Sequence, residues 1–148
     1  MKLVLDTNIF ISAFYWGGEP LKLINRIIEG LDELFISNEI LNETASVMAG
    51  PKFKTRAEIA EKYIRTIEKI GKKVFITGAI KGICRDKDDD DKIECGILGG
   101  ADYLITGDDD LLVLKKYKKI KILTVKAFFD ILNNEGSALK EAVINDDI

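Results

Sequence analysis

The sequence predicts a three-layer α/β/α fold, in which helices cover both faces of a central parallel sheet of about five strands. Three observations predict this fold class. Short apolar runs alternate with amphipathic segments along the 148 residues. The apolar runs have the length and composition of strands buried on both faces. Glycine or proline ends many of the segments, so that each run is expected to be a separate element.

The elements are expected in the following order. Strands are predicted at the apolar runs 2–5, 33–36, 73–77, 103–106 and 121–124. Helices are predicted where apolar residues recur at helical spacing, at 7–14, 20–30, 38–49, 55–70, 93–98, 109–116 and 128–132. A single domain is expected at residues 1–133, followed by a C-terminal tail at 134–148 that is either helical or frayed.

Local signals mark several helix ends. Pro20 is favourable in the first turn of the second helix. Ser37 is expected to cap the start of the third helix, because its hydroxyl can accept a hydrogen bond from a free backbone N–H. Thr55 and Glu58 have the spacing of a capping box for the fourth helix, which Gly71 is expected to end.

The composition excludes several kinds of chemistry. The chain has no histidine, which excludes His-dependent triads and most zinc sites. Cys84 and Cys95 are expected to be reduced packing residues. No apolar stretch could span a membrane and no export signal is visible, so a cytoplasmic protein is expected. The net charge of -3 does not exclude a nucleic-acid partner, because a basic rim can surround a carboxylate site.

Three acidic residues stand at positions that favour a site. Asp6 and Asp108 follow the first and fourth expected strands, and in a parallel sheet both would lie at the same edge. Each could instead be a simple helix N-cap. Glu43 projects to the margin of the apolar face of its helix, where a carboxylate needs a partner. That partner could be a nearby lysine or arginine.

Residues 85–92 form an acidic run, Arg-Asp-Lys-Asp-Asp-Asp-Asp-Lys. Such a run is usually a solvated loop. It does not fit an EF-hand, since counting from Asp86 places Asp91 where glycine is required and Ile97 where glutamate is required. The run leads into a helix whose first turn could direct one aspartate towards the sheet edge.

Taken in order, these segments resemble a PIN domain. The opening half is Leu-Asp-Thr-Asn at 5–8, with Glu43 ahead of Pro-Lys-Phe at 51–53. The closing half is the 85–89 segment, followed by Gly-Ala-Asp-Tyr at 100–103 and Thr-Gly-Asp at 106–108. The resemblance covers roughly residues 1–133 and is nearest to the VapC-like toxins of toxin–antitoxin systems.

The resemblance implies the roles of particular residues. Four acids take the metal-binding and catalytic positions of the family: Asp6, Glu43, Asp89 and Asp108. The third position stays open, because Asp88 and Asp90 flank Asp89. Supporting polar positions are matched by Asn8, Thr106 and Asp110. Two positions depart from the family pattern, since Lys87 stands where proline is usual and Gly96 where alanine is common.

The implied activity is a ribonuclease. Clustered carboxylates repel one another unless cations neutralise them, and oxygen ligands favour Mg²⁺ or Mn²⁺. Such ions can activate water and neutralise charge on a phosphodiester, and the resemblance implies 5′-phosphate and 3′-hydroxyl products. Candidate RNA contacts are Lys52, Lys54 and Arg56, which could equally be solubilising surface. The resemblance also implies a small antitoxin partner and a homodimer.

Other interpretations remain for the same pattern. A phospho-accepting or phosphohydrolase domain also places an aspartate after its first strand, but Asp6-Thr7-Asn8 lacks the second acid of such sites. A housekeeping RNA-processing nuclease would have the same acids as a toxin. A non-catalytic PIN-like binding module would be favoured by an incomplete acid set, and here every acid position is filled.

Overall fold

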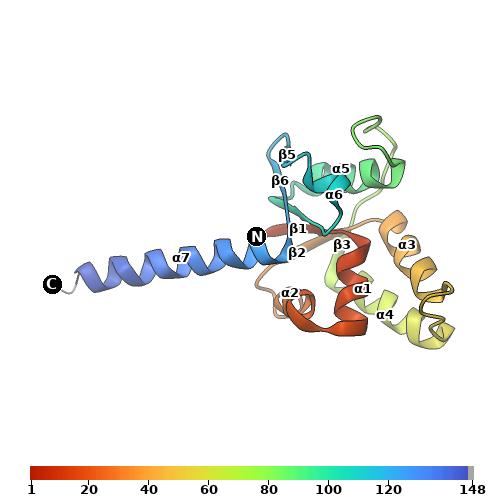
Figure 1. Ribbon diagram of the computed structural model, residues 1–148, viewed down its shortest axis with the longest axis horizontal. Helices are drawn as coiled ribbons and strands as arrows, with labels where there is room; N and C mark the ends of the chain where they lie inside the picture. The colour runs from red at the N-terminus through yellow and green to blue at the C-terminus, as the bar shows by residue number, and fades with distance from the viewer. Residues whose placement is uncertain (147–148) are drawn as a thin grey trace.

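The computed structural model describes residues 1–146 and contains one sheet (Figure 1). Its strands are β1 (Lys2–Leu5), β2 (Glu33–Ile36), β3 (Gly71–Lys73), β4 (Tyr103–Ile105), β5 (Lys116–Tyr117) and β6 (Ile120–Leu123). Its helices are α1 (Thr7–Trp16), α2 (Gly18–Ile28), α3 (Asn38–Ala49), α4 (Ala57–Ile70), α5 (Lys87–Gly99), α6 (Asp109–Leu112) and α7 (Val125–Asp146).

The sheet confirms the predicted fold class. The strand order is β3-β2-β1-β4-β6-β5, and the first five strands in that order are parallel. The short β5 was not predicted, and it pairs antiparallel with β6 at one edge. In Figure 1, α5 and α6 lie on one side of the sheet and α1, α2 and α4 lie on the other. The sheet order changes direction at β1, so β1 and β4 end side by side at the edge where ligands gather in such folds.

The core lies on both faces of the central strands. Leu3, Val4 and Leu5 of β1 are fully buried, as are Leu104 and Ile105 of β4. These apolar side chains fix the depth of the two strands, because shifting either strand would expose a continuous apolar run. The polar residues that follow β1 and β4 are therefore held in place by the core.

Two glycines let α5 lie close to the sheet. A Cβ atom on Gly99 would come within 2.4 Å of the Phe35 ring on β2. A Cβ atom on Gly96 would come within 2.9 Å of a methyl group of Ile120 on β6. Glycine at 96, where the family resemblance led us to expect alanine, therefore permits a close helix–sheet contact. This packing sets the height of the acidic residues in the first turns of α5.

Several local predictions were wrong. The helix expected at 109–116 ends at Leu112, with Lys116 in β5, and the helix expected at 93–98 begins at Lys87. The third strand is Gly71–Lys73 rather than 73–77, and the Val74 N–H still bonds to the Ile36 carbonyl at 2.8 Å as the chain leaves the sheet. The apolar residues beyond it do not form a strand, and Phe75 is 70% exposed. Thr55 does not cap α4, which begins after Arg56 without a side-chain cap. The Thr55 hydroxyl instead contacts the Tyr15 hydroxyl.

The C-terminal helix α7 leaves the body of the domain. Its first turns pack against the core through Phe128, and its remainder extends away, with Leu139 and Val143 exposed (Figure 1). The predicted tail is therefore helical from 134 to 146, while residues 147–148 lie outside the described part of the chain. Among residues 1–146 no helix combines the length and the apolar character needed to cross a membrane.

Candidate functional site

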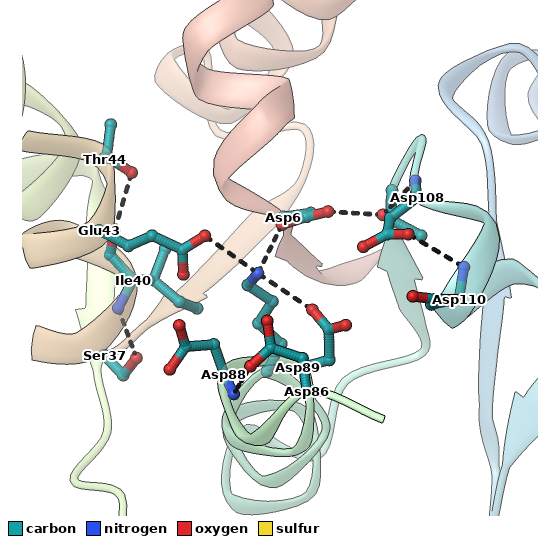
Figure 2. Close-up of polar contacts among 12 residues, drawn as sticks. Asp6, Ser37, Ile40, Glu43, Thr44, Asp86, Asp88, Asp89, Asp108 and Asp110 are labelled. Carbon is teal, nitrogen blue, oxygen red and sulfur yellow. Dashed lines mark hydrogen bonds and ion pairs between the residues drawn. The ribbon is translucent and has the colours of Figure 1, made fainter. Parts of the chain in front are cut away.

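Asp6 stands at the carboxyl end of β1. Its backbone N–H bonds to the Ile105 carbonyl at 2.9 Å, which continues the β1–β4 ladder. It occupies the N-cap position of α1, yet its side chain makes no capping hydrogen bond. The Asp6 side chain is 2% exposed and instead turns towards β4 and α5 (Figure 2). Simple N-capping therefore does not account for this carboxylate.

The segment after β4 continues the same edge. The Thr106 hydroxyl lies 2.6 Å from Asp6 Oδ2 and accepts a 2.9 Å hydrogen bond from the Asp108 N–H. Asp108 does cap its helix, because its Oδ1 accepts from the Asp110 N–H at 2.9 Å. Asp108 is partly buried and Asp110 is exposed. Figure 2 shows the Asp108 side chain beside Asp6, on the side away from Glu43.

Glu43 reaches the site from α3. Ser37 caps this helix as predicted, accepting a 3.2 Å hydrogen bond from the Ile40 N–H. The Glu43 side chain is 33% exposed, which agrees with its predicted place at the margin of the apolar face, whereas Glu39 is exposed. A surface pocket of about 470 Å³ opens beside it and is also lined by Glu39, Asp88 and Asp91. This side of the site is thus open and acidic.

The aspartates of the acidic run at 85–92 make different contacts. Asp86 caps α5, accepting from the Asp88 N–H at 3.0 Å, and Asp88 itself is exposed. Asp90 accepts hydrogen bonds from the backbone N–H groups of Gly82 at 3.0 Å and Cys84 at 2.7 Å. Asp90 therefore anchors the preceding loop. Among these neighbours, Asp89 is the one whose carboxylate faces the same centre as Asp6 and Glu43 (Figure 2).

That centre is the ammonium group of Lys92. Its Nζ lies 2.8 Å from Asp6 Oδ1, 3.4 Å from Glu43 Oε1 and 3.4 Å from Asp89 Oδ1. The Lys92 side chain is only 4% exposed. The alternative partner considered for Glu43, a nearby lysine, is therefore present. The same lysine pairs with two of the other expected site acids.

The cluster shifts the pKa values of its members. Burial raises the pKa of Asp89 to about 6 against the opposing effect of Lys92, and the charges of Asp108 and Asp6 add to the increase. Burial alone would lower the pKa of Lys92, but the charge and hydrogen bond of Asp6 raise it above its ordinary value, aided by Glu43 and Asp89. One ammonium among three carboxylates leaves the cluster with excess negative charge.

The donor atoms suit a hard divalent cation. All of the converging oxygens belong to carboxylates, the ligand type that Mg²⁺ and Mn²⁺ take in proteins. Within residues 1–146, no group of three or more His, Cys, Asp or Glu side chains is arranged to hold a metal ion. The Lys92 ammonium lies between the acids where such an ion would interact with them. The chemistry of the donor atoms fits a metal ion, and in this structure the Lys92 ammonium lies among them.

The remaining expected site residues lie outside the cluster. Asn8 is exposed in the first turn of α1. Lys52, Lys54 and Arg56 are exposed in the loop after α3, which starts about 9 Å beyond Glu43 along the helix axis. The Lys52 ammonium lies 5.6 Å from the centre of the Trp16 ring, and Arg56 pairs with Glu58 at 3.7 Å. These cations form a surface near the far end of α3.

Sequence reasoning did not identify Lys92. One signal was available, since Lys92 follows Asp89 by three residues and therefore shares its helix face. The apolar periodicity that normally identifies an inner helix face is absent here, because residues 86–92 are all charged. Asp90 was considered only as an alternative to Asp89, and Glu94 was not identified, although both hold the 77–84 loop through its backbone N–H groups.

Comparison with known proteins agrees with this architecture. An uncharacterized protein of Methanocaldococcus jannaschii is 31% identical over 148 residues, which covers 88% of this chain and 90% of the relative. A chain of the crystal structure of VapBC2 from Rickettsia felis, bound to a DNA fragment from their promoter, has a TM-score of 0.60 and 16% identity. That match covers 84% of this chain and 98% of the other and shows a shared fold. The sequence model of the PIN domain matches residues 2–110, which include all four expected metal-binding acids, and the chain therefore belongs to the PIN domain family.

Proposed function

We propose that this protein is a divalent-metal-dependent endoribonuclease whose active site consists of Asp6, Glu43, Asp89 and Asp108. PIN domains are generally nucleases, and the chain belongs to that family. One observation carries the assignment to these residues. Asp6, Glu43 and Asp89 come from three separate segments, and each has an oxygen within 3.4 Å of one buried cation. Asp108 adjoins them through Thr106.

The site residues have different roles in the proposed phosphodiester hydrolysis. A bound Mg²⁺ or Mn²⁺ supplies neutralisation of the charge that develops on the phosphate in the transition state. Asp6, Glu43, Asp89 and Asp108 would hold such an ion through their carboxylate oxygens. Thr106 fixes the orientation of Asp6, while Asp110 holds Asp108 through its backbone N–H. Asn8, at the start of α1, is the remaining supporting position in this proposal.

An RNA strand would approach over the open side of the site. The neighbourhood of Glu43 is acidic, so phosphate groups need cations beyond it. Lys52, Lys54 and Arg56 are exposed and uncommitted to the core, and Lys52 stands beside the exposed Trp16 ring, on which a base can stack. We propose this loop as the RNA-contacting segment of a catalytic domain that covers residues 1–133.

The biological role that we propose is the toxin of a type II toxin–antitoxin pair in the cytoplasm. The fold shared with a chain of VapBC2 from Rickettsia felis supports it. A small antitoxin and a second copy of this chain are the expected partners. A housekeeping RNA-processing nuclease is the alternative. The toxin would be favoured by a small gene directly upstream. Its product should co-purify with this protein and should suppress the growth arrest that expression of this protein causes.

One observation favours a different function, that of a non-catalytic PIN-like binding module. Lys92 already pairs with Asp6, Glu43 and Asp89, so these acids have a partner without any metal. A module of this kind would bind RNA or protein and cut nothing. The two functions predict opposite results in a cleavage assay.

The test is cleavage of a mixed single-stranded RNA pool with Mg²⁺, with Mn²⁺ or with EDTA. Wild type, Asp6→Asn and the control Asp130→Asn, which changes an exposed aspartate on α7, would be assayed side by side. The nuclease proposal expects metal-dependent cutting by wild type and by the control, and none by Asp6→Asn. Wild-type activity in a folded Asp6→Asn protein would refute the site assignment. Failure of every metal to support cutting of the pool would favour the binding module.

A further inference from the structure

The Lys92 side chain is placed more like a bound ion than like a surface lysine. Its side chain is almost completely buried, and its ammonium lies within 3.4 Å of carboxylate oxygens from Asp6 after β1, from α3 and from α5. Asp89 and Lys92 project from the same face of α5, because they are three residues apart. The close packing of Gly96 and Gly99 against the sheet holds that face at the level of Asp6.

We propose that Lys92 is a built-in counter-ion of the carboxylate cluster, and that a divalent metal ion binds there only by displacing its ammonium group. This inference rests on the proposed function, since it concerns the same metal site. It adds that the site is occupied by the protein's own cation before metal arrives. Lys92 thereby sets how much metal the enzyme requires.

The physical reason is competition for the same oxygens. The carboxylate oxygens that Lys92 contacts are those that would coordinate the metal, and an ammonium beside a divalent ion would repel it. Lysine carries its charge on a flexible four-carbon stem, so the ammonium can leave while the α5 backbone stays in place. The acidic pocket beside Glu43, lined by Asp88 and Asp91, offers other negative charge nearby.

Competition of this kind lowers the apparent affinity for metal. The protein binds the ion only in the fraction of molecules whose lysine has moved away, and the apparent dissociation constant rises in proportion. If Lys92 had a purely structural role, its removal would not increase the affinity for metal. In that case, removing Lys92 would leave the acids splayed or disordered, and metal binding would be unchanged or weaker.

The experiment measures Mn²⁺ binding by calorimetry and by electron paramagnetic resonance, using Lys92→Met, Lys92→Gln and wild type. The control is Lys87→Met, which removes an exposed lysine from the first turn of the same helix. We expect both Lys92 variants to bind Mn²⁺ at least about tenfold more tightly than wild type, which is a difference of about 1.4 kcal/mol. Lys87→Met should match wild type. Equal or weaker binding by a folded Lys92 variant would overturn the inference.

A second measurement needs no variant. In wild type labelled with ¹⁵N at the lysine side chains, saturating Mg²⁺ should shift the Lys92 ammonium resonance towards that of an exposed lysine. A bound ion that leaves this resonance unchanged contradicts displacement. This result keeps the inference testable even if the neutral variants fail to fold without metal.

RNA cleavage assayed on the same samples separates the two proposals. If wild type binds Mn²⁺ and cuts RNA while the Lys92 variants bind no more tightly, the inference fails and the nuclease stands. If the Lys92 variants bind Mn²⁺ more tightly but no sample cuts RNA, the inference stands and the nuclease fails. Absence of Mn²⁺ binding in every folded sample refutes both.

Discussion

The Thr106 hydroxyl donates a 2.6 Å hydrogen bond to Asp6 Oδ2 and so joins the ends of two neighbouring parallel strands across 100 positions of the chain. Both residues are buried, at 0% and 1% exposure. The same hydroxyl oxygen accepts from the Asp108 N–H. Thr106 therefore connects the two acids that follow β1 and β4 and fixes how Asp6 faces Lys92.

Replacing Thr106 with valine should weaken both folding and cleavage. The shape is kept, but Asp6 loses a donor and the Asp108 N–H loses an acceptor in a buried place. We expect a loss of about 1–3 kcal/mol in the free energy of unfolding. Thr106→Ser, which keeps the hydroxyl, should recover most of the stability and activity. Chemical denaturation and the RNA assay measure the two effects, and full activity in Thr106→Val would show that this hydrogen bond does not position Asp6.

Substitution of Asp89 and of Asp90 should have opposite consequences. Asp89→Asn removes a carboxylate from the Lys92 cluster, so metal-dependent cleavage should be lost while the fold is kept. Asp90→Asn weakens the acceptor of the Gly82 and Cys84 N–H groups, so it should cost about 1–3 kcal/mol of stability and leave cleavage largely intact.

Asp88→Asn serves as the control for these two variants, because Asp88 is exposed in the same turn. It should resemble wild type in both measurements. Loss of cleavage in Asp88→Asn, with activity retained in Asp89→Asn, would move the third acid of the site by one position.

The sequence predicted which acids lie at the sheet edge better than it predicted which side chains contact them. Asp6 and Asp108 could be placed because each follows an apolar run that becomes a central buried strand. In the acidic run, periodicity fails, since residues 89–94 are all buried although most are charged. The inward turn of Lys92 depends on packing between α5 and the sheet, which involves Phe35 and Ile120 from distant segments.

Strand β3 shows the same limit for the fold. The apolar residues at 74–76 favoured a strand at 73–77, yet β3 begins two residues earlier, at Gly71–Lys73, where the backbone pairs with β2. A Cβ atom at Gly71 would lie 3.0 Å from the Ile36 side chain, so glycine at this position lets β3 pack closely against that side chain on β2. The pattern of hydrophobicity along the chain cannot predict that contact.

Both cysteine thiols should be unreactive in the native protein. Burial raises the pKa of Cys95 to about 12, and burial together with Asp90 raises the pKa of Cys84 to about 12. The thiolate is the reactive form, so at pH 8 its population should be roughly a thousandfold smaller than in the unfolded chain. Alkylation by iodoacetamide, followed by mass spectrometry with and without denaturant, measures this. Native labelling of Cys95 as fast as in denaturant would contradict the burial described for α5.

Glu94 should make the protein sensitive to acid. Its side chain is buried and accepts hydrogen bonds from the Thr77 N–H at 2.6 Å, the Thr77 hydroxyl at 3.2 Å and the Ile80 N–H at 3.4 Å. Burial alone would raise the pKa of Glu94, but these hydrogen bonds lower it below its ordinary value. A carboxyl whose pKa is lowered by folding stabilises the native state above the unfolded pKa, here 4.5, and loses that contribution as the pH falls through the lower folded value.

Glu94→Gln therefore separates this contribution from those of the other carboxylates. At pH 7 and in EDTA the variant should be less stable than wild type by about 1–3 kcal/mol, because a neutral amide replaces a charged acceptor. The difference should shrink as the pH falls below 4.5 and through the lower folded pKa, because wild-type Glu94 then becomes protonated as well. Glu141→Gln, at an exposed position on α7, should show no difference at either pH. Urea denaturation across this pH range measures both variants, and a Glu94→Gln difference that stays constant with pH would show that the charge of Glu94 does not hold the 77–80 loop.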